Sequence, residues 1–139
     1  IAVRERNSEY LRKKLSEFPG VGPLQRQSYA TRHSQLLFLF RFHSEIAGID
    51  RQVFEDCLRA EGIPVQQLYP YPLYRNPMFR NSPFKNAGCP IAEANCEMIL
   101  ALPINVLMGL PADLDDVVSA VQKIYENKHV AQSLMSVSR

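Results

Sequence analysis

The sequence predicts an α+β fold, in which a small and mainly antiparallel sheet of about three strands is flanked by helices on one face. Hydrophobic patterns along the 139 residues follow the order helix, strand, helix, strand, loop, helix, helix. The clearest extended run, residues 33–42, alternates aliphatic and aromatic side chains as a strand does. A composition of 46% hydrophobic and 22% charged residues is that of one globular domain with its own core.

An amphipathic helix is predicted over residues 1–18, and the run Pro19–Pro23 ends it because proline cannot continue a helix. Its predicted apolar stripe consists of Val3, Tyr10, Leu11, Leu15 and Phe18. The pattern is already helical at Ile1, without an initiator methionine or a capping residue before it. We therefore expect the chain to be a piece of a longer protein.

The strand predicted over residues 33–42 carries apolar side chains on both faces, with Leu37 and Leu39 opposite a second set. Such a strand is expected in the middle of a sheet that is covered on both sides, or nearly so. The second set consists of Leu36, Phe38, Phe40 and Phe42.

A second helix is predicted between Asp50, which suits the N-cap position, and Gly62, which suits the turn after a helix. Its apolar face consists of Val53, Phe54, Cys57 and Leu58. A short strand is predicted over residues 63–68.

The tyrosine–proline loop, residues 69–90, contains five of the ten prolines and is therefore predicted to be neither helix nor central strand. Long loops of this kind are often functional, and its aromatic side chains favour an ordered one. These aromatic residues are Tyr69, Tyr71, Tyr74, Phe79 and Phe84.

The last third of the chain predicts a helix over residues 91–99, an extended piece over 100–103 and a long helix capped by Asp113. We expect residues 1–128 to form the domain and residues 129–139 to be a frayed tail. The long helix is expected to bury Leu114, Val117, Val118, Val121 and Tyr125. The predicted core consists of Phe38, Phe40, Val53, Phe54, Leu58, Val117, Val118 and Val121.

Charge and cysteine content exclude several classes of function. A formal net charge of +2 argues against a nucleic-acid binder, and no run approaches the ~18 apolar residues of a membrane span. The three cysteines lack zinc-type spacing and a nearby histidine, so neither a metal site nor a disulfide framework is expected. This cysteine usage is typical of the reducing cytoplasm.

Two segments, residues 24–44 and 62–92, contain no acidic residue but several arginines. If they met in the fold, they would form a positive, tyrosine-lined surface suited to a phosphate or carboxylate. Arginines that face only water, or tyrosines in a protein interface, remain alternatives.

Three segments of the chain resemble the C-terminal part of the DegT/DnrJ/StrS aminotransferases. They are EYLRKKLSEFPGVGPL (9–24), IDRQVFEDCLRAEGIPVQQLYPYPLY (49–74) and PIAEANCEMILALPINVLMGLPADLDDVVSAVQKIYE (90–126). These enzymes use pyridoxal phosphate, share the aspartate-aminotransferase fold and aminate keto-sugars or keto-cyclitols. Within the family, YPYPLY at residues 69–74 resembles the glutamine-dependent cyclitol (scyllo-inosose type) branch.

The resemblance implies that the chain is the small domain of a homodimeric enzyme whose amino donor is glutamine or glutamate. In that family a lysine of the large N-terminal domain holds the cofactor as a Schiff base, so no catalytic or cofactor-binding residue is expected here. Lys85, in Ser-Pro-Phe-Lys at residues 82–85, lacks the family's flanking glycines and is interpreted as an ordinary loop lysine. The chain alone is therefore expected to be inactive.

The resemblance also implies that the tyrosine–proline loop and the start of the 33–42 strand lie on the substrate side of the intact enzyme. The predicted substrate-binding residues are Tyr69, Tyr74, Arg75 and His33, with Tyr71 and Arg32 as further candidates. Against a missing N-terminal domain we expect an exposed apolar surface made by Val3, Tyr10, Ile104, Val106, Leu107 and Met108. Two alternatives remain: a non-enzymatic binding or dimerisation module that uses the tyrosine–proline loop, and a regulatory domain that binds an anionic metabolite.

Overall fold

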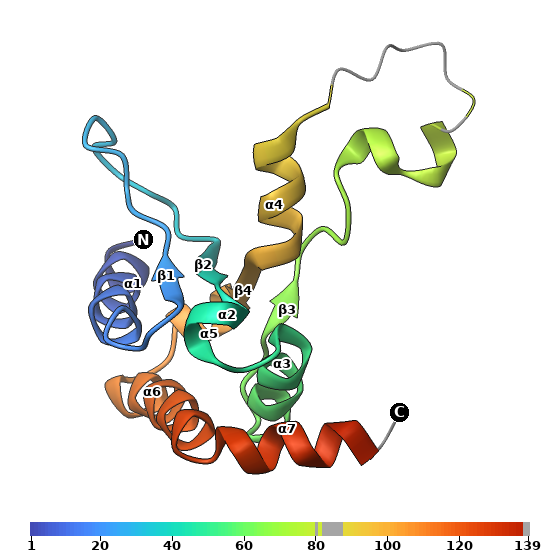
Figure 1. The fold of residues 1–139 in the computed structure, drawn as a ribbon. Helices are drawn as coiled ribbons and strands as arrows, with labels where there is room; N and C mark the ends of the chain where they lie inside the picture. Colours follow the sequence, from blue (N-terminus) through green and yellow to red (C-terminus); the bar gives the residue numbers. More distant parts are fainter. Residues whose placement is uncertain (80, 82–87, 138–139) are drawn as a thin grey trace.

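The computed structural model describes residues 1–79, 81 and 88–137, and its centre is a four-stranded antiparallel sheet (Figure 1). The strands are β1 (Val21–Pro23), β2 (Leu37–Phe42), β3 (Gln66–Gln67) and β4 (Ile99–Pro103). Their order across the sheet is β1-β2-β4-β3. The predicted α+β class is confirmed, with one strand more than expected.

The helices gather mainly on one face of the sheet (Figure 1). They are α1 (Ala2–Leu15), α2 (Ser44–Ala47), α3 (Arg51–Ala60), α4 (Pro90–Met98), α5 (Ile104–Leu107), α6 (Pro111–Glu126) and α7 (Lys128–Val137), with 3-10 turns η1 (Leu73–Arg75) and η2 (Pro77–Phe79). Helix α4 is the exception to this arrangement. Its Asn95 accepts a hydrogen bond of 3.1 Å from Arg41 Nε of β2. That bond ties α4 to the less buried side of β2.

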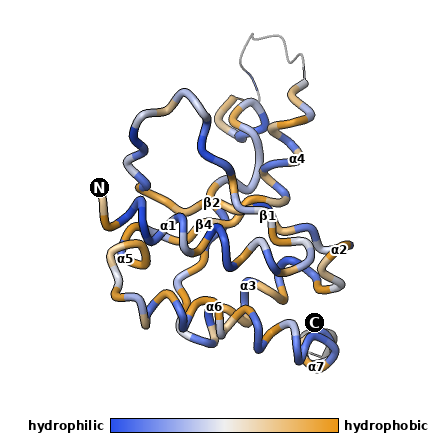
Figure 2. Tube along the Cα trace, turned by 90° about the vertical axis from the view of Figure 1, so that its left-hand side faces the viewer, coloured by the Kyte–Doolittle hydropathy of each residue, from blue (hydrophilic) through white to orange (hydrophobic). Residues whose placement is uncertain are grey.

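Strand β2 is central, as predicted, but only one of its faces is fully covered. Phe38 and Phe40 pair with Leu102 and Leu100 of β4, and all four side chains are buried. Leu37 and Leu39 on the opposite face are only half-buried. One face is therefore fully covered and the other nearly so, and the alternation that makes 37–42 a strand is confirmed. In Figure 2 the strands at the centre carry hydrophobic residues.

The predicted core is confirmed for all its residues except Val118, which packs against it while partly exposed. Phe42 of β2 stacks on Phe54 of α3 with ring centroids 4.1 Å apart, and Tyr125 of α6 meets Phe54 edge-on at 6.4 Å. These rings join the sheet, α3 and α6 into one hydrophobic cluster.

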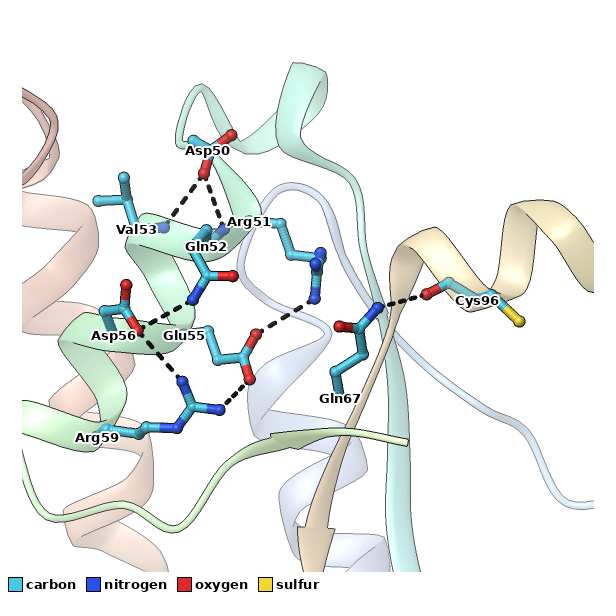
Figure 3. Close-up of polar contacts among 9 residues, drawn as sticks. All are labelled: Asp50, Arg51, Gln52, Val53, Glu55, Asp56, Arg59, Gln67 and Cys96. Carbon is cyan, nitrogen blue, oxygen red and sulfur yellow. Dashed lines mark hydrogen bonds and ion pairs between the residues drawn. The ribbon is translucent and has the colours of Figure 1, made fainter. Parts of the chain in front are cut away.

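Helix α3 begins and ends where its sequence predicts. Asp50 Oδ1 accepts hydrogen bonds from the backbone N–H groups of Gln52 and Val53, as an N-cap does (Figure 3). Gly62 follows the helix with a φ of +83°. The same helix buries Glu55, which forms ion pairs with Arg51 and Arg59 and so compensates the burial of its charge.

The predicted strand at 33–42 begins later than expected, at Leu37. Gln35 has a φ of 47°, and its N–H donates to His33 Nδ1, so the chain turns before the strand can start. The strand predicted at 63–68 shortens to β3. The run Pro19–Pro23 is predicted only to end the first helix. In the structure the same run contains strand β1, which pairs with β2.

The predicted apolar stripe of the first helix faces the core in large part: Leu11 and Leu15 are fully buried, and Tyr10 and Phe18 pack against the core. Asn7 and Ser8 are buried, while Val3 is 39% exposed. Asn7 Nδ2 donates to the carbonyl oxygens of Leu107 and Gly109, each at 3.0 Å, which binds α1 to the end of α5. Leu107 is completely buried, so its place in a predicted exposed surface is wrong.

The rest of that predicted surface is only partly exposed. Met108 is 55% exposed, but Ile104, Val106 and Tyr10 are half-buried, the last with its hydroxyl donated to Asp115.

Helix α6 begins at Pro111, two residues before the predicted cap. Asp113 lies within its first turn and accepts a 2.6 Å hydrogen bond from the N–H of Leu110, so it caps from position N3. After α6, residues 128–137 form α7 instead of the expected frayed tail. Gln132 Nε2 donates to Gly48 O at 2.9 Å, a long-range contact that the weak local pattern does not reveal.

No helix in the described ranges is both long and apolar enough to cross a bilayer.

Burial raises the pKa of Tyr125 to about 12, and its hydroxyl donates to Pro19 O at 2.5 Å. An unfolded tyrosine ionises near pH ~10. The pKa of Tyr125 is higher in the folded protein than in the unfolded chain. Its contribution to the free energy of unfolding is therefore fully present below about pH 10 and is lost as the pH rises towards 12. We expect the free energy of unfolding, measured with urea, to fall across this interval. In Tyr125→Phe the free energy of unfolding should fall less steeply with pH. Equal slopes of this free energy against pH in the two proteins would contradict the raised pKa of Tyr125.

Candidate functional site

The described part of the tyrosine–proline loop leaves the sheet at β3 and runs alongside α4 (Figure 1). Its first fixed point is Gln67, whose Nε2 donates to Cys96 O at 3.0 Å (Figure 3). The loop therefore starts against the last turn of α4.

The second fixed point is Glu93, which lies near the start of α4. The hydroxyl of Tyr74 donates to Glu93 Oε1, and Arg75 Nη2 forms an ion pair with Glu93 Oε2 at 2.8 Å. The Tyr74 hydroxyl also accepts a 3.2 Å hydrogen bond from the N–H of Cys89. The bond to the Glu93 carboxylate raises the pKa of Tyr74, because it favours the protonated phenol.

Between these fixed points lies an open cavity of about 690 Å³, which we call the tyrosine–proline cavity. Its walls are mainly apolar. Tyr69 is 70% exposed and Tyr71 is 39% exposed, so both residues are accessible to solvent. The lining residues include Tyr69, Pro70, Tyr71, Pro72, Tyr74 and Cys96.

Within the described ranges, the two acid-free segments do not make the positive surface that their sequence predicts. Glu93 of α4 neutralises Arg75, and Glu5 of α1 lies 3.5 Å from Arg26 Nη1. The N–H of His33 donates to Glu5 Oε1 at 3.0 Å, and this bond is the main cause of the lowered pKa of Glu5. Each segment therefore receives an acid from a helix elsewhere in the sequence.

His33 lies apart from the three predicted residues of the tyrosine–proline loop. It lines a separate cavity of about 160 Å³ with Arg12, Arg26 and Gln35. That cavity belongs to the β1–β2 connection, which projects on the α1 side of the sheet (Figure 1). Within the described residues, the fold brings Tyr69, Tyr74 and Arg75 together and leaves His33 and Arg32 on a different surface.

The described residues do not fit a covalently held pyridoxal phosphate. Lys123 lines a cavity of about 580 Å³, but it shares that cavity with Glu61, Asp113 and Asp116. Its ammonium group pairs with Glu61 at 2.7 Å, and three carboxylates would repel a phosphate. Lys85 lies outside the described residues.

A metal centre is likewise not assembled among the described side chains, where no group of three or more His, Cys, Asp or Glu could hold an ion.

Sequence reasoning missed Glu93 and Asn95 of α4. Both lie in the segment PIAEAN, which has no motif of its own, and their partners are 18 or more residues away along the chain. The signal that could have found Glu93 is its position: it is the first acid after 31 residues without one.

Solved structures share this fold. The chain superposes on 3-amino-5-hydroxybenzoic acid synthase with a TM-score of 0.73 and 24% identity, covering 88% of this chain and 34% of that one. DesV of S. venezuelae, solved with a ketimine intermediate, gives a TM-score of 0.71 and 25% identity over 90% and 32% of the two chains. Helicobacter pylori PseC, an aminotransferase of pseudoaminic acid biosynthesis, gives 0.71 and 19% over 91% and 33%.

The chain thus spans about a third of the length of these neighbours. No curated protein matches it by sequence. Residues 1–122 match the family model of the DegT/DnrJ/EryC1/StrS aminotransferases, which is most of the chain. With the shared fold, this match establishes that the chain belongs to the DegT/DnrJ/EryC1/StrS aminotransferase family.

Proposed function

We propose that the chain is the C-terminal small domain of a pyridoxal-phosphate-dependent aminotransferase that transfers an amino group from glutamine or glutamate to a keto-sugar or keto-cyclitol. The family match over residues 1–122 is the observation that carries this proposal. The cofactor supplies the electron sink of the reaction, and a lysine of an N-terminal domain holds it. We expect the chain alone to be inactive, because the family resemblance places that lysine in the N-terminal domain.

The substrate side of the domain is the tyrosine–proline cavity. Tyr69 and Tyr71 are accessible to solvent, and their hydroxyls can donate to and accept from the hydroxyls of a sugar or cyclitol ring. Arg75 is 54% exposed at its side chain and keeps N–H groups beyond the one that contacts Glu93, so it can still bind the carboxylate of an amino donor. The ring of Tyr74 lines the wall.

His33 belongs to the proposed substrate surface only if another part of the complete protein, or a second copy in a homodimer, closes the distance to the cavity. The three cysteines are all free thiols, which favours the cytoplasm as the site of action.

The kinetic test uses the complete, cofactor-loaded protein with glutamine as donor and scyllo-inosose as the acceptor probe. We expect Tyr69→Phe and Arg75→Ala to raise the half-saturating concentration of one substrate about tenfold, since each removes a contact that orients the substrate. The absorbance of the bound cofactor should remain that of the parent.

Tyr29→Phe is the matched control, because Tyr29 is 83% exposed on the β1–β2 connection, away from the cavity. Parent-like constants for Tyr69→Phe and Arg75→Ala with both substrates would contradict the proposed role of the loop. They would favour a structural role or a protein interface.

A further inference from the structure

The side chain of Glu93 uses both carboxylate oxygens to hold neighbouring residues of one turn. Oε1 accepts from the Tyr74 hydroxyl, and Oε2 pairs with Arg75 Nη2 at 2.8 Å. Tyr74 and Arg75 both belong to η1, so one residue of α4 fixes the turn through two different chemical groups. A carboxylate is well suited to this because it accepts several charge-assisted hydrogen bonds at once.

The described start of the tyrosine–proline loop relies on such side-chain contacts, because its prolines remove backbone donors. Pro70 and Pro72 have no N–H group to donate. The backbone hydrogen bonds within η1 are local ones, from Arg75 N to Pro72 O and from Asn76 N to Leu73 O. Contacts within the turn can shape it but cannot fix its position relative to α4.

The contacts with α4 lie at the two ends of the cavity wall. Gln67 bonds to Cys96 O at one end, and Tyr74 and Arg75 bond to Glu93 at the other. Residues 69–72, which include the exposed Tyr69 and Tyr71, lie between these ends and line the cavity. Without Glu93, that end of the wall would lose its two contacts to the carboxylate and keep the 3.2 Å hydrogen bond from the Cys89 N–H to the Tyr74 hydroxyl.

We propose that Glu93 is a positioning residue: acting through Tyr74 and Arg75, it holds residues 69–76 on α4 and so sets the shape of the cavity for the substrate. The inference rests on the proposed function, in that the ligand of the cavity is a substrate of the aminotransferase. Glu93 itself need not touch that substrate.

The first measurement needs no substrate. Trypsin cleavage after Arg75 in the complete, cofactor-loaded protein is followed by mass spectrometry for the parent, Glu93→Gln and Glu93→Ala. We expect the cleavage rate to rise about tenfold in Glu93→Ala, because a protease cuts segments that open locally. Glu93→Gln should rise less, since its amide oxygen can still accept from Tyr74.

Glu97→Gln is the matched control, because Glu97 is an exposed acid one turn further along α4. It should be cleaved at the parental rate. The midpoint of thermal unfolding should stay near the parental value in all variants, which separates local opening from global loss of the fold. An unchanged cleavage rate in Glu93→Ala would overturn the proposal.

The second measurement separates positioning from a purely structural contact. With glutamine as the probe, Glu93→Ala should raise the half-saturating concentration about tenfold and leave the limiting rate of the cofactor's absorbance change within about twofold. Faster cleavage with an unchanged half-saturating concentration would overturn the positioning role. If the parent itself gives no absorbance change with glutamine or glutamate, the proposed function fails, while the cleavage result still decides whether Glu93 fixes the loop.

Discussion

Gly20→Ala is expected to lower the free energy of unfolding by about 2–4 kcal/mol, through backbone strain and steric overlap together. Gly20 has a φ of +84°, a backbone conformation that residues other than glycine rarely adopt. A Cβ atom there would lie 2.7 Å from His43 O and 2.8 Å from Ala47 N, and neither backbone atom can move away alone. The same glycine accepts a 2.8 Å hydrogen bond from the N–H of His43, so the overlap would disturb the link between β1 and α2.

Gly62→Ala separates the contribution of backbone strain from that of steric overlap. Its φ of +83° is nearly the same, but nothing lies within 4 Å of the added Cβ atom. We expect a loss of about 1 kcal/mol, from the left-handed backbone alone. Urea denaturation of both variants gives the comparison. Equal losses would show that the close approach at Gly20 is relieved without cost.

Phe54→Ala is expected to lower the free energy of unfolding by about 3–5 kcal/mol, since it opens a cavity in the middle of the core. The Phe54 side chain is fully buried, stacks on Phe42 with planes 13° apart and meets Tyr125 edge-on. Through these two rings it joins β2, α3 and α6. Calorimetry or urea denaturation measures the loss.

Ile91→Ala is the control for the loss of apolar area, because Ile91 lies on α4 and is 77% exposed. Its expected effect is within about 0.5 kcal/mol. A Phe54→Ala loss below about 1 kcal/mol would mean that the aromatic cluster is not the centre of the core.

Sequence patterns predict those parts of the fold whose structure is determined locally. Asp50 and Gly62 delimit α3 because capping and left-handed turns involve only neighbouring residues. Alternation predicts β2 for a similar reason. The buried polar face of α1 could not be predicted, since Asn7 is buried through bonds to carbonyl groups 100 and 102 residues away. Strand β1 and helix α7 likewise depend on distant partners.

In the candidate site too, the sequence predicts the features that are determined locally and not those that depend on distant residues. Proline and tyrosine content identify the loop and its exposed aromatic side chains, because composition alone excludes helix and central strand there. The charge of the surface could not be predicted from acid-free segments, since Glu93 and Glu5 approach Arg75 and Arg26 from helices. His33 and the loop share a charge pattern in the sequence, yet they line separate cavities of the fold.

We propose that this chain supplies the substrate side of an aminotransferase whose cofactor is held elsewhere in the complete protein. The most direct measurement is the visible absorbance of the complete, pyridoxal-phosphate-loaded protein and of residues 1–139 alone, each titrated with glutamine and then glutamate. We predict that one of these donors abolishes the absorbance of the bound cofactor in the complete protein, and that residues 1–139 alone bind no cofactor. A complete protein that retains no pyridoxal phosphate, or whose bound cofactor responds to neither amino acid, would contradict the account.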